Sequence, residues 1–485
     1  MTISRLKTAF SQLLEHKTTP LWPLAGITLL AAGLRFYKLG EWSFWIDEIY
    51  TINRAQIHFS DLATMLRTLP ATLWLPVSVI FTEGFLKVFG VNEWSARLAS
   101  TLIGIISIPI LFFATRKIIE TWTALTLALL LAVSPWHLFW SQNARFYTSL
   151  LLLYTLAGLQ FYKAIEFDKP KNIFIFYLLL YFALSERMLA ILLLPAVLVY
   201  LAALVIFRYE KPAGFNRRNF LFTILPMFGL GVFDALRLGL TGSSFVLDTF
   251  NDFFGKAIDS PIRILILILY NIGIPLACLA LLSAIYFIKE KNRLGLFLAI
   301  NAIFTTLLVV AISQFTFVVD RFVFMTLPSW IILAAFCVID VHQKYKAQGI
   351  LLAVGALLIL IADAGSAHLM YYQLNHGNRP EWRQAFEFVM ERARVNDVLV
   401  SSVDNVGSYY AKRDVVALGD FNPMQIAGTG QRVWFVLDFE NSWFAGEQKE
   451  WVEDNADLLE IYYLRVRERM FLKIYYYDEN YSSPK

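Results

Sequence analysis

Two adjacent carboxylates, Asp47 and Glu48, are the residues of this sequence best suited to chemistry. They follow the first long apolar stretch of the chain. Acids at the edge of a membrane are costly to desolvate and usually have a function. Ile46, Ile49 and Ile52 recur every three residues, which predicts an amphipathic helix in the membrane interface with both acids in its first turn. An alternative is that the acids only complement the dipole of this helix.

A second group of polar side chains lies in the turn Ser134–Tyr147, between two apolar stretches. It contains Gln142, Arg145 and Tyr147, together with a histidine between two tryptophans. The planar guanidinium of Arg145 could bind a phosphate through two parallel hydrogen bonds. The alternative is that Arg145 extends to the lipid headgroups without any ligand.

Two further charged turns need an interpretation. Arg321 heads a later apolar stretch and is a second candidate phosphate ligand, although Asp320 could simply neutralise it. Glu186 and Arg187 stand between two apolar stretches so close that the turn must be tight. We interpret this second pair as a structural ion pair.

The elements that position these residues belong to a membrane protein. Apolar residues make up 58% of the 485 residues and charged residues 16%, against about half and about a quarter in soluble domains. Long apolar runs recur, each close to the roughly 20 residues that cross a bilayer. They predict a multi-pass helical protein of the cell membrane with eleven spans, at about 20–37, 96–115, 121–136, 148–166, 172–186, 188–207, 219–240, 262–288, 294–312, 322–340 and 348–364.

The distribution of basic residues orients these spans. If the segment 73–90 lies in the interface and does not cross, the basic loops alternate cleanly, and the positive-inside rule then assigns them to the cytoplasm. We therefore expect a cytoplasmic N-terminus over 1–19 and a transmembrane domain over 20–364, with interfacial helices within 42–90. Asp47, Arg145 and Arg321 then share the outer side, and the segment 365–485 lies outside the cytoplasm.

Residues 365–485 have the composition of a small α/β domain. The pattern predicts an amphipathic helix over 381–394, buried strands over 398–402 and 433–438, and a closing hairpin formed by 462–466 and 471–477. No nucleotide-binding, metalloprotease or Ser-His-Asp spacing occurs. The two cysteines fall in apolar runs and fit neither a disulfide framework nor a zinc site. We assign no cofactor, leave a divalent metal open, and expect no nucleic-acid partner.

Several segments, taken in order, resemble the GT-C superfamily of glycosyltransferases that use lipid-linked sugars. The match is strongest to the group of protein O-mannosyltransferases and aminoarabinose transferases (glycosyltransferase families 39 and 83). The resemblance covers most of the chain and rests on the segments Trp45–Glu48, Phe89–Ser100, Ser134–Tyr147, Arg321–Pro328 and Glu381–Val389.

This resemblance implies a GT-C fold and a polyprenyl-phosphate sugar donor, with a hydroxyl of a lipid, glycan or protein as acceptor. Asp47 would be the general base, and Glu48 would orient it or bind a sugar. The donor would be bound by Gln142, Arg145, Tyr147 and Arg321. Inversion at the anomeric carbon is also implied.

A transporter or flippase of a lipid-linked sugar is the alternative, because it too would place charges and a groove inside a membrane. No inverted repeat or matched pair of broken helices supports it. A third reading is an outer-face binding or assembly protein whose working part is the C-terminal domain.

Overall fold

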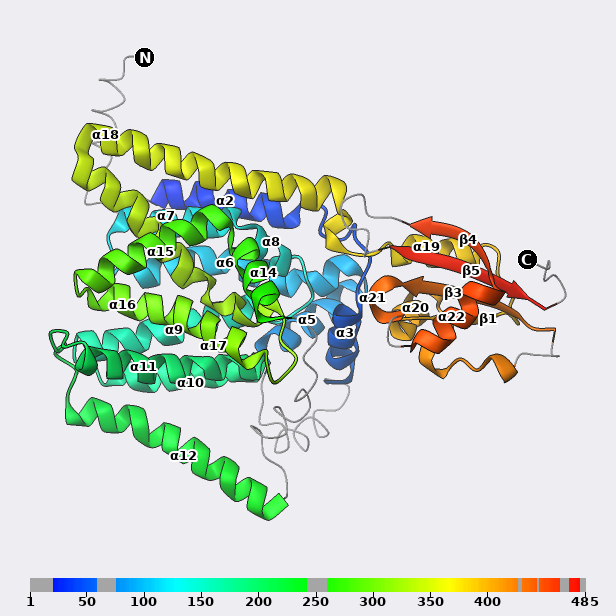
Figure 1. Ribbon diagram of the computed structural model, residues 1–485, viewed down its shortest axis with the longest axis horizontal. Helices are drawn as coiled ribbons and strands as arrows, with labels where there is room; N and C mark the ends of the chain where they lie inside the picture. Colours follow the sequence, from blue (N-terminus) through cyan, green and yellow to red (C-terminus); the bar gives the residue numbers. More distant parts are fainter. Residues whose placement is uncertain are drawn as a thin grey trace.

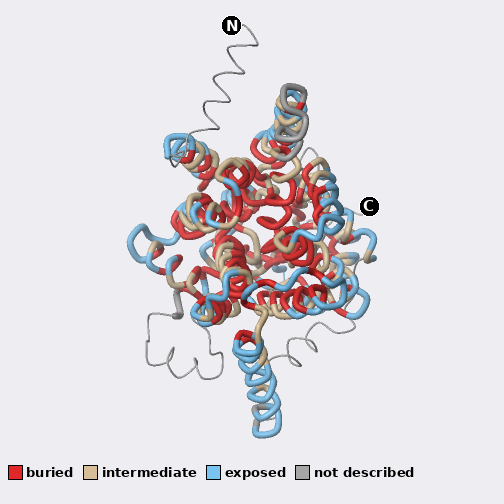
Figure 2. The backbone as a smooth tube through the Cα atoms, turned by 90° about the vertical axis from the view of Figure 1, so that its left-hand side faces the viewer, coloured by how far each residue is buried: buried red, intermediate tan, exposed pale blue. Residues whose placement is uncertain are grey.

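The computed structural model describes residues 21–58, 76–241, 260–425, 430–442, 445–462 and 471–479. The predicted cytoplasmic segment 1–19 lies outside these residues. Figure 1 shows a helical bundle and, at one end of it, a smaller unit that contains a β-sheet. Buried residues gather in the middle of the bundle and exposed ones around its outside (Figure 2).

The bundle runs from Leu21 to Asn378. Its longer elements are α2 (Leu21–Phe36), α3 (Ile46–His58), α5 (Val77–Phe89), α6 (Glu93–Thr115), α7 (Thr121–Val133), α8 (Pro135–Ser141), α9 (Tyr147–Glu166), α10 (Lys171–Glu186), α11 (Leu193–Ile206), α12 (Arg217–Thr241), α14 (Pro261–Ile272), α15 (Ile274–Lys289), α16 (Arg293–Ala299), α17 (Thr305–Ile312) and α18 (Leu327–Leu369). Short 3-10 or π turns join or extend them at η1 (Met188–Leu192), η2 (Ile300–Phe304), η3 (Asp320–Thr326), η4 (Met370–Leu374) and η5 (His376–Asn378).

Within the described residues, six helices are long and apolar enough to cross a membrane, or up to eight if each of two bent pairs is one span. This confirms a multi-pass helical protein, while the predicted number of eleven spans is not confirmed. The segment 77–89, which was expected to lie in the interface, forms the separate helix α5.

The predicted span 121–136 is broken, because α7 and α8 meet at an angle of 59°. Pro135 has no amide hydrogen, so it cannot continue the hydrogen bonds of α7. The Ser134 side chain caps the new helix. The carbonyls of Leu131 and Ala132 next to the break accept hydrogen bonds from the fully buried guanidinium of Arg35. The break directs α8 toward the turn that carries Arg145.

A second correction concerns the predicted span 262–288. It consists of two helices, α14 and α15, which meet at 97°. Gly273 separates them with φ +97°, a conformation that side chains other than glycine rarely adopt. Pro275 stands in the first turn of α15, where a missing amide hydrogen costs nothing.

The C-terminal unit is a mixed α/β structure. Its elements are α19 (Trp382–Met390), β1 (Val398–Ser401), α20 (Asp404–Ala411), β2 (Val416–Ala417), β3 (Arg432–Asp438), α21 (Phe439–Ser442), α22 (Gly446–Asn455), β4 (Asp457–Tyr462) and β5 (Leu472–Asp478). The strand order is β2-β1-β3-β5-β4. β1 is parallel to β2 and β3, and β5 is antiparallel to β3 and β4.

The two strands predicted over 398–402 and 433–438 are present. The hairpin is also present, but its first strand ends at Tyr462 where the prediction began it, and 463–466 lies outside the described residues.

The C-terminal unit shares a hydrophobic core with the bundle. Phe44, Ile49 and Ile52, around the two acids, belong to the same buried cluster as Trp382 and Phe386 of α19. In addition, Arg383 pairs with Glu93 at 2.6 Å at the start of α6. The unit is therefore packed directly against the segment that carries Asp47.

Gly377 marks a close approach in this interface. Its φ is +66°, and an added Cβ would lie 2.4 Å from Cδ1 of Trp42. We expect Gly377→Ala to lower the melting temperature of the purified protein by several degrees, because both the backbone and the indole must shift. Gly419→Ala is the matched control, since a Cβ there meets nothing within 4 Å. Equal melting temperatures for the two variants in detergent would contradict this account.

Candidate active site

Asp47 lies between two arginines that come from distant parts of the chain. Its Oδ2 is 3.7 Å from Nη2 of Arg145 and 3.7 Å from Nη2 of Arg321. The Asp47 side chain is 22% exposed, so it can reach a ligand from solvent or from the membrane surface. The fold thus brings together three of the residues selected from the sequence.

Arg145 is held in place by the helix that carries Asp47. Its Nη1 donates to the Asp47 carbonyl at 2.8 Å and to Oγ1 of Thr51 at 3.0 Å. Its guanidinium carbon lies 4.9 Å from the ring centre of Phe146. Arg321 is oriented similarly, over the indole of Trp45 at 5.6 Å. The Arg145 guanidinium is therefore held by hydrogen bonds within the protein, whereas Arg321 lies against an aromatic ring and is partly exposed.

Each of these arginines keeps an unused donor. Within the described part of the chain, the Nε atoms of Arg145 and Arg321 are buried and have no hydrogen-bond partner. A buried donor without a partner carries a desolvation cost that a bound acceptor removes. The two arginines have Asp47 between them and Asp320 as a further acidic neighbour of Arg321, and their two free donors make the site suited to an additional acceptor such as an anion.

Tyr147 belongs to the same cluster. Its hydroxyl has Arg321, Arg145 and Asp47 among its electrostatic neighbours. Its ring lies 3.9 Å, centre to centre, from that of Trp140 in α8. Tyr147 therefore lies where a hydroxyl could contact a ligand held by the arginines.

Two more arginines lie near this cluster, and sequence reasoning did not assign either to it. Arg187 lies 5.7 Å from the ring of Phe146, the same ring that Arg145 covers. Arg54 has Arg187 and Arg145 as electrostatic neighbours. Because Arg54 follows Asp47 by seven residues, two helical turns, the period of α3 could have placed it on the face of Asp47.

The interpretation of Glu186 and Arg187 as an ion pair is wrong. The Glu186 carboxylate instead accepts hydrogen bonds from the amide and the hydroxyl of Ser78, at 2.9 and 2.5 Å, in the first turn of α5. In the described structure no ion pair joins Glu186 to Arg187. The Arg187 side chain is exposed and lies over Phe146.

Glu48 has a different environment from Asp47. It is fully buried, and Arg97 binds both of its oxygens at 2.8 and 2.9 Å. The amide of Ala144 donates to the same carboxylate at 2.9 Å, and Nε of Arg379 lies 3.4 Å away. Burial by itself would raise the pKa of Glu48, but the guanidinium groups of Arg97 and Arg379 and these hydrogen bonds hold the pKa below its usual value.

The ion pair between Glu48 and Arg97 also organises the loop before α3. Arg97 lies in the second turn of α6, whose start is fixed by a reciprocal capping box between Asn92 and Ser95. Its remaining donors bind the carbonyls of Leu39, Trp42 and Ser43. Glu48 therefore holds together the segments around Asp47. Its buried and paired carboxylate is not exposed to a sugar, which was one of its two predicted roles, and the other role, orienting Asp47, stays a prediction.

Gln142 is another buried residue that holds the elements around the site together. It is fully buried, and its Nε2 donates to the carbonyls of Arg35 and Tyr37 at 2.9 and 2.7 Å. Its Oε1 accepts a hydrogen bond from Tyr371. These contacts use the whole amide group, so its position differs from that expected for a donor ligand.

The described residues contain no group of three or more His, Cys, Asp or Glu side chains that could hold a metal ion. No metal ligand is therefore assigned in this site.

We expect Glu48→Gln to destabilise the protein by about 3–5 kcal/mol, because it leaves the buried charge of Arg97 without its partner. Asp47→Asn is the matched control one residue away, since Asp47 is partly exposed and makes only 3.7 Å ion pairs. The measurement is the yield and melting temperature of each variant in detergent. Equal stability of the two variants would show that Glu48 does not have this supporting role.

Comparison with known proteins agrees with this architecture. A family model described as dolichyl-phosphate-mannose-protein mannosyltransferase matches residues 72–215. This range includes α5, Arg97, Arg145 and Arg187, but not Asp47 or Arg321. No curated protein sequence matches the chain.

Solved structures match over nearly the whole chain. ArnT from Cupriavidus metallidurans, bound to undecaprenyl phosphate, has a TM-score of 0.57 at 13% identity, covering 96% of this chain and 100% of that one. AglB, an oligosaccharyltransferase from Archaeoglobus fulgidus, in complex with an inhibitory peptide and a dolichol-phosphate, has a TM-score of 0.52 at 12% identity. That match covers 96% of this chain and 74% of AglB. The chain therefore has the fold of these proteins, which is the GT-C fold that the resemblance in its sequence implied.

Proposed function

We propose that this protein is an inverting glycosyltransferase that moves a sugar from a polyprenyl-phosphate donor to an acceptor hydroxyl. The observation that carries the proposal is the partly exposed Asp47 carboxylate held at 3.7 Å from both Arg145 and Arg321. The fold is shared with ArnT, which has been solved with undecaprenyl phosphate. The hydroxyl could belong to a lipid, a glycan or a protein.

The electrostatics of the site support a phosphate ligand. In the free protein, Asp47 is the counterion of both arginines. A donor phosphate carries negative charge on several oxygens and would use the unpaired Nε donors of Arg145 and Arg321. Phosphate binding would then loosen the hold of the arginines on Asp47 and free the carboxylate to act as a base.

In the proposed reaction, Asp47 takes the proton from the acceptor hydroxyl as its oxygen attacks the anomeric carbon. The bond between that carbon and the phosphate oxygen breaks on the opposite face, so the configuration inverts. Polyprenyl phosphate leaves with one additional negative charge, which Arg145 and Arg321 stabilise. In this proposal, Tyr147 hydrogen-bonds the phosphate or the sugar.

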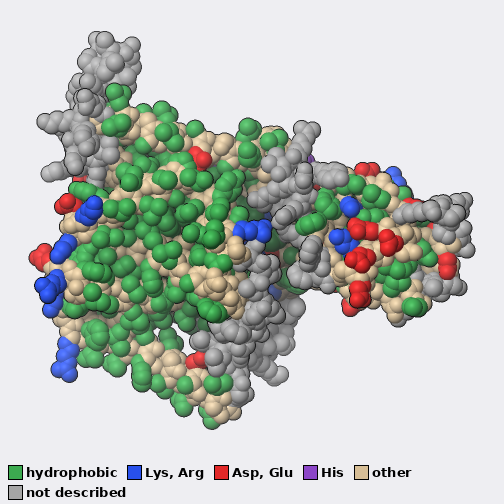
Figure 3. Space-filling model, in the orientation of Figure 1, with side chains coloured by type: hydrophobic (Ala, Val, Ile, Leu, Met, Phe, Trp, Pro, Cys, Tyr) green, Lys and Arg blue, Asp and Glu red, His purple; other side chains and the backbone are tan. Residues whose placement is uncertain are grey.

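We further propose that this chemistry takes place on the outer face, with the C-terminal unit extracytoplasmic and the N-terminus cytoplasmic. In support, Lys and Arg side chains gather at the edge of the bundle farthest from the C-terminal unit (Figure 3). Such an accumulation is typical of a cytoplasmic edge. The eleven-span topology remains part of this proposal.

We expect Asp47→Asn to lower turnover by about two to four orders of magnitude, because the general base is lost. Binding of polyprenyl phosphate should stay intact, since both arginines remain and lose their competing carboxylate. The measurement is transfer of radiolabelled sugar from the lipid, alongside binding of the unlabelled lipid phosphate. Normal turnover in this variant would remove Asp47 from catalysis. Normal flipping of the lipid without any transfer activity would instead favour a transporter.

Arg145→Lys tests whether the Arg145 guanidinium binds the donor phosphate. Lysine keeps the charge but cannot hold the Asp47 carbonyl and the Thr51 hydroxyl while also offering a free donor. We expect affinity for polyprenyl phosphate to fall about tenfold or more, as for a lost charge-assisted hydrogen bond. Arg263→Lys, in the first turn of α14, is the control for a general loss of arginine. If Arg145 only reached the lipid headgroups, Arg145→Lys would leave the affinity for polyprenyl phosphate unchanged.

A further inference from the structure

Asp320 and Arg321 are adjacent in the chain but bind different partners. Nη2 of Arg321 lies 3.7 Å from Oδ2 of Asp47. The Asp320 carboxylate instead accepts a hydrogen bond from the side-chain amide of Asn271. Among the residues that the structure describes, Arg321 therefore forms its ion pair with Asp47 and not with the acid directly beside it.

The local backbone separates these two side chains. Asp320 and Arg321 begin η3, a 3-10 helix. Such a helix has three residues per turn, so consecutive side chains project about 120° apart. One direction leads from Arg321 to Asp47 and the other from Asp320 to Asn271. Two adjacent opposite charges are thus directed toward different elements of the bundle.

The position of Asn271 follows from the break between α14 and α15. Asn271 is the last residue but one of α14, and the chain turns by 97° directly after this helix, at Gly273. α14 packs against η3. The break therefore ends α14 beside η3, and the last turn of α14 supplies the amide that binds Asp320.

The charges around Arg321 show why this hydrogen bond matters. Asp47 and Asp320 are the acids among the strongest electrostatic neighbours of Arg321. If Asp320 also paired with Arg321, its carboxylate would compete with an anionic ligand for the same guanidinium. Asn271 is neutral, so it satisfies the carboxylate without bringing another charge to the site. Asp363 of α18 also lies near the break, beside Gly273, but it is not among those neighbours.

We propose that Asn271 is a positioning residue for donor binding: it holds Asp320 away from Arg321, so that the Arg321 guanidinium stays available to the phosphate of the polyprenyl donor. This inference rests on the proposed function. Asn271 touches neither the donor nor the acceptor in this account and acts through Asp320 alone.

Asn271→Leu tests this role, because leucine has a similar volume and no hydrogen-bond donor. The Asp320 carboxylate then loses its partner and turns to Arg321. We expect the affinity for undecaprenyl phosphate, measured with the full-length protein in nanodiscs, to fall about fivefold, as when a partly exposed ion pair must first be broken. Tyr270→Leu is the control in the same helical turn, since the Tyr270 side chain is 58% exposed, and its affinity should stay unchanged.

Asp320→Asn separates this competition from a general loss of structure. The double variant Asn271→Leu/Asp320→Asn should recover the affinity of the unmodified protein, because no carboxylate remains to compete for Arg321. Asp320→Asn alone should bind undecaprenyl phosphate at least as tightly as the unmodified protein. A double variant as weak as Asn271→Leu, or a loss of affinity in Asp320→Asn alone, would overturn the proposal.

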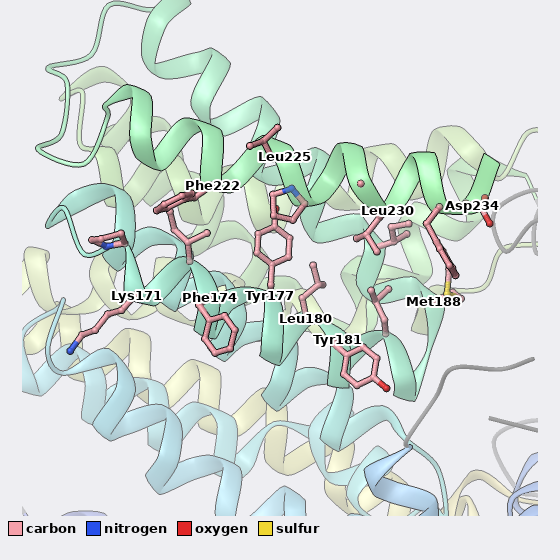
Figure 4. Close-up of a pocket in the computed structure, with 17 residues that line it drawn as sticks. Lys171, Phe174, Tyr177, Leu180, Tyr181, Met188, Phe222, Leu225, Leu230 and Asp234 are labelled. Atoms are coloured by element: carbon pink, nitrogen blue, oxygen red, sulfur yellow. The ribbon is translucent and has the colours of Figure 1, made fainter. Parts of the chain in front are cut away.

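Asp234→Asn is the matched control for removal of an acid elsewhere in the bundle. Asp234 of α12 stands at one end of an apolar groove of about 900 Å³ between α10 and α12 (Figure 4). It is not among the strongest electrostatic neighbours of Arg321. Asp234→Asn should therefore not restore binding in the Asn271→Leu background. Equal rescue by Asp234→Asn would show a general effect of charge and contradict the role of Asn271.

The position of Asp320 can also be measured without any lipid. A structure of Asn271→Leu should show the Asp320 carboxylate within about 4 Å of the Arg321 guanidinium, the distance of an ion pair. An unchanged arrangement of Asp320 and Arg321 would overturn the inference, even if donor binding were weaker. If the unmodified protein binds no polyprenyl phosphate, the proposed function itself fails, and this structural comparison still decides whether Asn271 holds Asp320 away from Arg321.

Discussion

The buried ion pair between Glu48 and Arg97 is the interaction on which the rest of the site depends. Arg97 neutralises the carboxylate and also binds three carbonyls of the loop that precedes α3. Glu48 in turn binds the Ala144 amide, one residue before Arg145. The buried Glu48–Arg97 pair thus connects the loop that leads to Asp47 with the turn that carries Arg145. Its desolvation cost is offset only because every charged atom is paired.

The adjacent acids Asp47 and Glu48 have different surroundings, and in the proposed function only Asp47 takes part in the reaction. Successive residues of a helix point about 100° apart, so one acid faces the interior while its neighbour faces Arg145 and Arg321. Glu48 is fully buried with its oxygens satisfied, and Asp47 keeps a partly exposed carboxylate between two arginines. The buried, paired Glu48 directly beside the partly exposed Asp47 fixes the orientation of the first turn of α3.

The C-terminal unit also helps to hold the candidate site in place. Arg379 extends from the linker before α19 and contacts the Glu48 carboxylate and the Gln142 carbonyl. Trp382 and Phe386 share a core with the residues around the acids. Removal of the whole unit would expose that core and also withdraw Arg379. The α/β unit and the bundle therefore form one structure around the site, even though the sequence shows a change in composition between them.

The sequence by itself indicated the membrane class, two buried strands and the first helix of the α/β unit, and the three candidate site residues Asp47, Arg145 and Arg321, which the fold brings together. These follow from local information: apolar runs, residue periodicity, and charges placed where desolvation is costly. It could not separate the roles of Asp47 and Glu48, because that depends on Arg97 and Arg379, which are distant in the chain. Nor could the sequence show that Gln142 is buried and binds backbone carbonyls, or that Glu186 and Arg187 form no ion pair in the described structure. Only the tertiary structure decided those points, because burial and hydrogen-bond partners depend on which helices pack together.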